Sequence, residues 1–163
     1  MDLTPSPEAN AILDQVRKMF EQDILPRNRE MIRSTKQDGE LDPPFLDELR
    51  AKAKSMGLWN MAHTDLTDRQ PGLSMSNLDY SIVAELLGRA FWSSKVFNCQ
   101  WPDVPNMVAL QRYATEEQKE QWLKPLLDGD CQSAFAMTEP GAASSDAKNI
   151  AATITPDGDD YIV

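Results

Sequence analysis

Residues 135–146 read FAMTEPGAASSD, and this short segment separates two stretches of the chain that differ in character. Pro140 and Gly141 suit the two central positions of a type II turn, in which glycine supplies a positive φ. Small residues follow the turn and hydroxyl groups flank it, so another molecule can approach the backbone closely. Such a loop can bind a ligand with a phosphate at one end and a planar polar heterocycle at the other. It can equally be an ordinary connection between strands, whose hydroxyls satisfy their own backbone.

The roughly 130 residues before this segment have the pattern of a helical domain. Apolar residues at helical spacing predict a first helix over residues 8–36, which Pro26 should kink or break because it lacks a backbone N–H. Four further helical regions are expected. The first starts at Pro43-Pro44 and ends at Gly57, and the second is opened by Ser76 with Asp79. The third covers residues 93–113 and is interrupted by Pro102 and Pro105, and the fourth starts with a Thr115/Gln118 capping box and ends at Pro125 and Gly129.

The residues after Gly129 have the pattern of strands. CQSAFAM (131–137) is apolar enough for a buried strand, and AATIT and YIV flank an Asp157-Gly158 turn, which is a hairpin signal. We therefore expect an N-terminal α-helical domain over 1–130 and the start of a β domain over 131–163. Because two or three strands alone leave unpaired edges and little buried surface, we expect the chain to be a portion of a larger protein.

Composition excludes several classes of function. The formal net charge of −10 disfavours nucleic acid, which is bound through clusters of Lys and Arg. The apolar runs are too short for a membrane span, and no targeting signal is visible, so we expect a bacterial protein to be cytoplasmic and a eukaryotic one to lie in the mitochondrial or peroxisomal matrix. Cys99, Cys131 and His63 are too few and too scattered for a zinc site, and no metal is expected. We expect both cysteines to be reduced, buried and inert, and His63 to be solvated.

The loop and the segments before it resemble the acyl-CoA dehydrogenase family. The family's first flavin-contacting signature is aromatic-x-x-Thr-Glu-Pro-Gly-Ala-Gly-Ser-Asp, which FAMTEPGAASSD resembles except that it is one residue longer. The resemblance covers about residues 8–163, and the subfamily most similar to this chain is that of family members 10 and 11 in animals and many bacterial homologues. The other matching segments are GLWNM (57–61), AELLGRAFW (84–92), VFNC (96–99), PD (102–103), NMVAL (106–110) and RYATEEQKEQWLKPLLDGDCQSAFAMTEP (112–140).

The resemblance implies FAD as the cofactor and assigns roles to the residues of the loop. Phe135 and Met137 would line the flavin ring, and the Thr138 hydroxyl would bond its polar edge. Gly141 belongs to the same flavin-binding turn. Ser145 would lie near the FAD pyrophosphate and the acyl-CoA chain, although the extra residue leaves open whether Ser144 or Ser145 faces the phosphates.

Two acids of the loop have structural roles by the same resemblance. Glu139 would shape the loop, and Asp146 would close the turn by accepting backbone N–H groups. Outside the loop, by analogy, Asn98, Trp101 and Asp103 would border the acyl tunnel, although a tryptophan among apolar residues is more often part of a core.

The implied fold is the N-terminal all-α domain of the acyl-CoA dehydrogenases followed by the first strands of their middle β domain. The implied activity of the complete protein is α,β-desaturation of acyl-CoA thioesters in fatty-acid oxidation, with an electron-transferring flavoprotein as acceptor and a homo-oligomeric assembly. The family's catalytic base is a glutamate in its C-terminal helical domain, so no catalytic residue is expected within 1–163, and this chain alone is expected to be inactive. Two alternatives stay open: a flavoprotein oxidase on the same scaffold, and a stand-alone helical interaction module.

Overall fold

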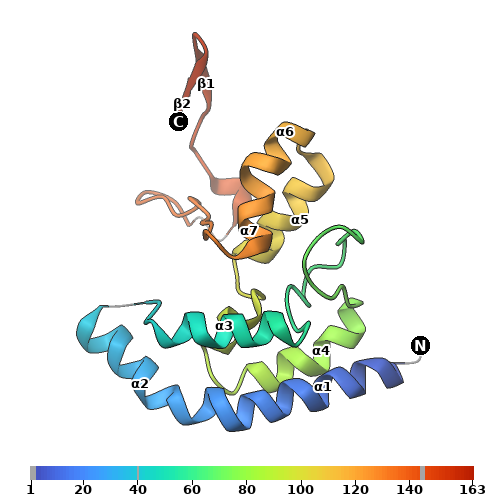
Figure 1. Ribbon diagram of the computed structural model, residues 1–163. Helices are drawn as coiled ribbons and strands as arrows, with labels where there is room; N and C mark the ends of the chain where they lie inside the picture. The colour runs from blue at the N-terminus through green and yellow to red at the C-terminus, as the bar shows by residue number, and fades with distance from the viewer. Residues whose placement is uncertain (1–2, 40, 144–145) are drawn as a thin grey trace. The chain divides into compact units, whose positions relative to one another are not determined.

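The computed structural model describes residues 3–39, 41–143 and 146–163 of the chain. The chain divides into two compact units, Met1–Ser133 and Ala134–Val163. The first unit is built from helices, and the second contains a short antiparallel hairpin (Figure 1). The expectation of a mainly helical chain with strands only near its C-terminus is confirmed.

The N-terminal helix is long and changes its winding in the middle. Helix α1 (Pro7–Met19) continues through a π-helical turn (Phe20–Ile24) and a 3₁₀ turn (Leu25–Arg27) into α2 (Asn28–Arg33). A second π-helical turn, Ser34–Asp38, leads to Gly39, whose φ of 70° ends the helix. The irregular turns surround Pro26, which cannot donate a helical hydrogen bond, so the predicted helix with a disturbance at this proline is confirmed.

Helices α3 (Phe45–Ser55) and α4 (Asn77–Leu87) lie beside α1 and close the main core (Figure 1). Gly57 ends α3 as predicted: it has a φ of 72°, its N–H donates to the Lys54 carbonyl at 3.0 Å, and the Leu58 N–H donates to the Ala53 carbonyl at 2.9 Å. Ser76 caps α4 as predicted, because its Oγ accepts from the Asp79 N–H at 3.1 Å.

The remaining helices of the first unit form a smaller core of their own. A 3₁₀ turn, Ser93–Phe97, precedes α5 (Asp103–Tyr113), and α6 (Glu116–Gln118) passes through a π-helical turn, Lys119–Leu123, into α7 (Lys124–Asp128). The Thr115/Gln118 capping box is confirmed. The expected helix end at Pro125 is wrong, because the proline stands in the first turn of α7, where no intrahelical N–H is needed. The buried members of this core are Met107, Leu123, Leu126 and Leu127.

The second unit contains one hairpin, made of β1 (Thr155–Asp157) and β2 (Asp160–Ile162), with Pro156 opposite Tyr161. A hairpin is present as predicted, but its central turn residues are Gly158 and Asp159, one residue later than the predicted Asp157-Gly158 pair, and its first strand is Thr155–Asp157 and not AATIT. Gly158 has a φ of 64°, which the first central position of a tight hairpin turn requires. The predicted strand over residues 131–137 is wrong: the segment has no strand partner in the described chain, and a strand exists only through its ladder of hydrogen bonds.

Burial contradicts three expectations made from the sequence. His63 is completely buried, Cys131 is exposed, and Trp101 is 72% exposed and not part of a core. Cys99 is buried as expected, and burial raises the pKa of its thiol to about 11. Both cysteines are free thiols.

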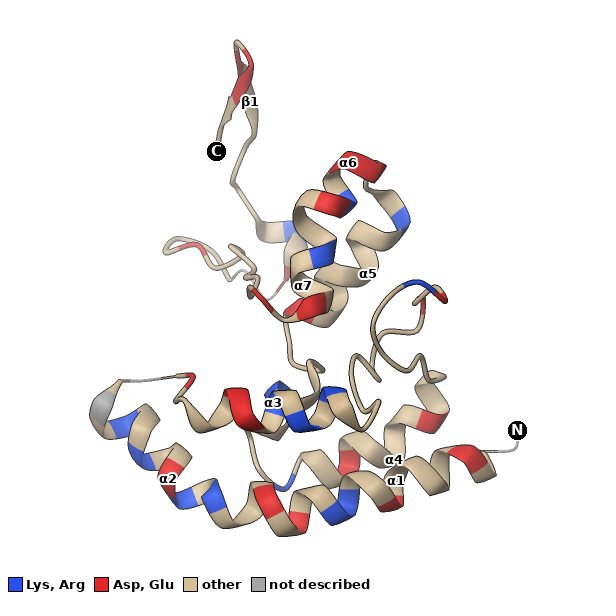
Figure 2. Ribbon diagram, viewed as in Figure 1, with Lys and Arg blue, Asp and Glu red and all other residues tan. Residues whose placement is uncertain are grey.

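Acidic and basic residues both occur along α1, α2 and α3 (Figure 2). Asp42 joins α3 to the 3₁₀ turn Ser93–Phe97, since its carboxylate pairs with Arg50 at 3.0 Å and with Lys95 at 2.5 Å. Burial opposes ionisation of Asp42, but the two cations outweigh it and hold the pKa of the carboxyl below its ordinary value. No helix in the described ranges is long and apolar enough to cross a lipid bilayer.

Candidate functional site

The loop that follows Met137 is organised by the carboxylate of Glu139. Both Glu139 oxygens accept from the Ala151 N–H, at 3.1 and 3.0 Å, and Oε1 also accepts from the Ala152 N–H at 2.8 Å. The carboxylate therefore ties the start of the loop to backbone twelve and thirteen residues further along the chain. The prediction that Glu139 shapes the loop is confirmed.

The turn at Pro140 and Gly141 is present but is not of the predicted type. The Ala142 N–H donates to the Glu139 carbonyl at 3.3 Å, which closes a four-residue turn. Gly141 does not have a positive φ, so the expectation of a type II turn is wrong. A Cβ at Gly141 would meet no atom within 4 Å. The local chain thus leaves the surface at this glycine open to another molecule.

Three side chains predicted to contact a flavin are accessible on this segment. Phe135 is 46% exposed and Met137 is 38% exposed, and Thr138 is exposed beside them in the chain. Apolar side chains of this size are usually covered in a folded protein, and a planar apolar ring is one group that can cover them. Ser144 and Ser145 lie outside the described residues.

Asp146 binds a backbone N–H group as expected, but the turn that it closes follows the Pro140-Gly141 turn. Its Oδ1 accepts from the Lys148 N–H at 3.1 Å and so caps the short 3₁₀ turn Ala147–Asn149. The two acids of the segment therefore both bind backbone N–H groups.

The first unit contains a buried polar network around two of the residues singled out in the sequence. Asn98 donates to the Asn60 Oδ1 at 2.7 Å and to the Leu126 carbonyl at 2.8 Å. Asp103 is 1% exposed and accepts from the Ser133 N–H and the Ser133 hydroxyl, both at 2.6 Å. Trp101, the third candidate, is exposed.

Sequence reasoning missed Ser133 and Asn60. Nothing in the local pattern pairs Asp103 with a serine thirty residues later. The sequence does place Asp103 at the start of a helix, but a carboxylate is common there and is usually exposed, so this position does not predict a buried partner. For Asn60 the sequence offered only its place in the matched segment GLWNM. The structure shows that it adopts a φ of 55°, a conformation in which Asn is several times more frequent than most residues.

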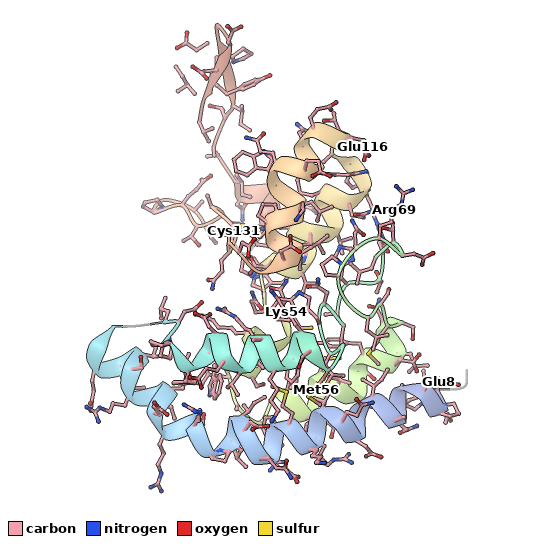
Figure 3. The ribbon with its side chains drawn as sticks, viewed as in Figure 1. Glu8, Lys54, Met56, Arg69, Glu116 and Cys131 are labelled. Carbon is pink, nitrogen blue, oxygen red and sulfur yellow. The ribbon has the colours of Figure 1, made fainter. Side chains whose placement is uncertain are left out.

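The same network joins the C-terminal end of α7 to the main core. Trp59 Nε1 donates to the Leu127 carbonyl at 2.7 Å, and Asn60 donates to the same carbonyl at 3.0 Å. Figure 3 shows Lys54 extending from α3 toward α7, where its Nζ lies 4.5 Å from the centre of the Trp59 ring. Carbonyls at a helix end lack intrahelical partners, and here side chains from the main core supply them.

A largely apolar groove of about 680 Å³ runs between α5 and the helix that ends in α7. Leu110 and Leu126 form part of its wall, and the exposed rings of Tyr113 and Trp122 border it. Cys131, labelled in Figure 3 on the segment that follows α7, also lines the groove.

Comparison with known proteins identifies the family of the helical unit. The family model described as "Acyl-CoA dehydrogenase, N-terminal domain" matches residues 6–130. Acyl-CoA dehydrogenase family member 11 of Gallus gallus is 39% identical over 163 residues, which is 97% of this chain and 20% of that protein. Family member 10 of Mus musculus is 40% identical over 161 residues, covering 97% of this chain and 15% of that protein.

Bacterial proteins give the same result. Probable acyl-CoA dehydrogenase FadE2 of Mycobacterium tuberculosis is 47% identical over 125 residues, or 74% of this chain and 28% of that protein. The solved structure of a putative acyl-CoA dehydrogenase from Mycobacterium abscessus superposes with a TM-score of 0.80 at 42% identity, covering 96% of this chain and 40% of that one. This chain thus spans a fifth or less of the animal relatives named above. The fold, the match of the family model and these identities show that the chain belongs to the acyl-CoA dehydrogenase family and carries its N-terminal domain.

Proposed function

We propose that the complete protein of which this chain forms part is an FAD-dependent acyl-CoA dehydrogenase. The observation that carries the proposal is the loop after Met137, in which the Glu139 carboxylate holds the backbone while Phe135, Met137 and Thr138 stay exposed. Family membership supplies the reaction class: oxidation of an acyl-CoA thioester across its α and β carbons.

The residues of the loop fit a flavin. Phe135 and Met137 offer accessible apolar surface for a planar ring, and the exposed Thr138 hydroxyl can hydrogen-bond a polar ring edge. The open position at Gly141 allows close approach to the backbone. We propose these four residues as FAD contacts, together with Ser144 and Ser145, one of which would contact the pyrophosphate, and Ser145 as a contact of the acyl-CoA.

The chemistry divides between the cofactor and the protein. A bound flavin supplies a hydride acceptor. The residues of this chain hold and orient the ring, and they fix the turn beside it. We assign no catalytic residue within 1–163, and Glu139 is not a candidate base because both of its oxygens already bind backbone N–H groups.

The remaining proposals concern the complete protein. We propose a helical domain over 1–130 followed by a β domain that begins at 131, assembly into a homo-oligomer, and an electron-transferring flavoprotein as acceptor. The proposed locations are the bacterial cytoplasm or a eukaryotic mitochondrial or peroxisomal matrix.

The test uses the full-length protein and a pair of threonine variants. Wild type should purify with bound FAD or take it up on reconstitution, and an acyl-CoA should bleach the flavin under anaerobic conditions. Thr138→Val should weaken FAD binding about fivefold to tenfold, the value of one hydrogen bond, while Thr153→Val, an exposed threonine of the same unit, should not.

Two results would separate the alternatives. Rapid reoxidation of the reduced flavin by an oxygen pulse would favour an oxidase over a dehydrogenase. A full-length protein that binds no FAD after reconstitution would contradict the proposed function and leave an interaction module as the better reading.

A further inference from the structure

We propose that Asp103 is a positioning residue for the flavin-binding loop: its buried carboxylate fixes the backbone at Ser133, two residues before Phe135. This inference rests on the proposed function, since it assigns a role in holding the segment that would contact FAD. The residue that Asp103 holds, Ser133, lies directly before the loop.

Asp103 has a complete set of hydrogen-bond donors. One carboxylate oxygen, Oδ1, accepts from the Ser133 N–H and the Ser133 hydroxyl, each at 2.6 Å, and the other, Oδ2, accepts from Gln100 Nε2 at 2.5 Å. The Ser133 hydroxyl in turn accepts from Asn106 Nδ2 at 2.8 Å. Both Asp103 and Asn106 belong to α5, so one helix holds the backbone and the side chain of Ser133.

The burial of this carboxylate is costly and is not balanced by a cation. Asp103 is 1% exposed, and no Lys or Arg of the described chain forms an ion pair with it. Removing a carboxylate from water costs several kcal/mol unless hydrogen bonds or charges replace the lost hydration. Its place in the first turn of α5 gives some compensation, because the positive end of the helix dipole lies there.

The hydrogen bonds of Asp103 indicate that it fixes the segment that begins at Ser133. A carboxylate at the start of a helix that stabilised only its own helix would accept hydrogen bonds from the first N–H groups of that helix. Here Oδ1 binds the backbone of a residue thirty positions later. The segment that begins there has no strand ladder or buried side chain among its described residues. Its start is held by hydrogen bonds: the backbone N–H of Ser133 donates to Asp103, and the side chain of the neighbouring Gln132 donates to Asp42 at 2.5 Å.

The experiment compares four variants in the full-length flavoprotein. Asp103→Ala removes the acceptor, whereas Asp103→Asn keeps one oxygen that can accept from the Ser133 N–H. Ser133→Ala removes the hydroxyl and keeps the N–H bond. The control, Val83→Ala, weakens the core at a completely buried position of α4 without touching Ser133.

Three quantities are measured: amide hydrogen exchange of the peptide covering 131–141, the dissociation constant for FAD after removal and re-addition, and the visible circular dichroism of bound flavin. Asp103→Ala should speed exchange and weaken FAD binding about tenfold to a hundredfold, with a changed flavin spectrum. Asp103→Asn should recover most of the affinity, and Ser133→Ala should lose less than Asp103→Ala. Val83→Ala should leave exchange at 131–141 and the spectrum unchanged.

Several results would overturn the inference. One is faster exchange in Asp103→Ala with unchanged FAD affinity and spectrum, and another is an equal loss of affinity in Val83→Ala, which would make the effect one of general stability. If Asp103→Ala does not fold, unchanged exchange and affinity in both Asp103→Asn and Ser133→Ala would also overturn it. A wild type that binds no FAD contradicts the proposed function instead, and the exchange data then decide alone whether Asp103 fixes Ser133.

Discussion

His63 is the chain's one histidine, and folding buries it completely. Its Nδ1 accepts from the Asp65 N–H at 3.2 Å, and its carbonyl accepts from the Ser74 hydroxyl at 3.1 Å. Burial lowers the pKa of His63 below 6.5, although the Met107 backbone and the Asp65 charge oppose this shift. The folded protein therefore favours the neutral ring.

The stability of the protein should fall as the pH drops below about 6.5. There the unfolded chain binds a proton at His63 that the folded chain resists, so stability is present above the unfolded pKa and is lost at a limiting slope of about 1.4 kcal/mol per pH unit. Urea unfolding at pH 7.5, 6.5 and 5.5 measures this loss for wild type and His63→Gln, which cannot titrate. Equal pH dependence in the two proteins would show that other groups cause it.

Single residues were predicted well where their role is local and poorly where it depends on distant parts of the chain. Glu139 acts within its own loop and was predicted correctly, and Asp146 binds a backbone N–H group as predicted, although in the 3₁₀ turn that follows. His63 lies in a sequence rich in polar residues, which predicts solvation, but its loop folds back against α5 through the ion pair between Asp65 and Arg112. Trp101 shows the reverse case, since apolar neighbours in sequence do not determine on which side of the backbone a ring lies.

At the scale of elements, the end of α7 depends on Gly129. Its φ is 75°, and a Cβ there would lie 2.7 Å from Cζ2 of Trp59. Gly39 ends the first helix with a φ of 70°, and a Cβ there would meet nothing within 4 Å. The two glycines therefore share a backbone conformation and differ in surroundings.

Gly129→Ala should destabilise the protein by about 1–2 kcal/mol from backbone strain, plus about 1–3 kcal/mol from the clash with Trp59. Gly39→Ala should cost the strain alone. The difference in urea midpoint between the two variants, at an unchanged m-value, isolates the clash. Equal costs would show that the Trp59 ring moves aside freely.

Asn98 offers a second test of the same helix end. Its side chain caps the Leu126 carbonyl at 2.8 Å, and its backbone φ is 53°. Asn98→Gly should cost about 1–3 kcal/mol because the Leu126 carbonyl keeps only the Gly129 N–H at 3.1 Å and the buried Asn60 Oδ1 loses its Asn98 donor. Asn98→Ala should cost about 1 kcal/mol more because alanine disfavours this φ. Denaturant unfolding of both variants gives the two values. An alanine variant as stable as the glycine variant would contradict the contribution of φ.

The helices of the first unit were predictable because their signals are local. Caps, apolar spacing and glycine ends occur within one or two turns, and the limits at Ser76, Thr115 and Gly57 follow from them. The π-helical turns and the passage through Pro125 were not predicted, since they depend on how neighbouring helices accommodate the disturbance. The strand expected at 131–137 failed for a related reason: a strand needs a partner, and apolar composition alone does not supply one.

At the scale of the whole molecule, the two units differ in what stabilises them. The first unit contains every buried residue of the described chain, including the large rings of Phe20, Trp92 and Phe97. In the second unit no described residue is buried, and Tyr161, Ile162 and Val163 are more than half exposed. Because burial of apolar surface is the main stabilising contribution, the first unit should account for nearly all of the folding free energy.

A chain that ends at Ser133 should therefore unfold like the chain of 163 residues. The free energies of unfolding should agree within about 1 kcal/mol, and the m-values should be similar because little additional surface is exposed when residues 134–163 unfold. All four tryptophans lie before residue 134, so their fluorescence reports the same transition in both chains. A markedly lower midpoint for the shorter chain would contradict this, and would mean that residues 134–163 stabilise the helical unit through contacts that their exposure does not indicate.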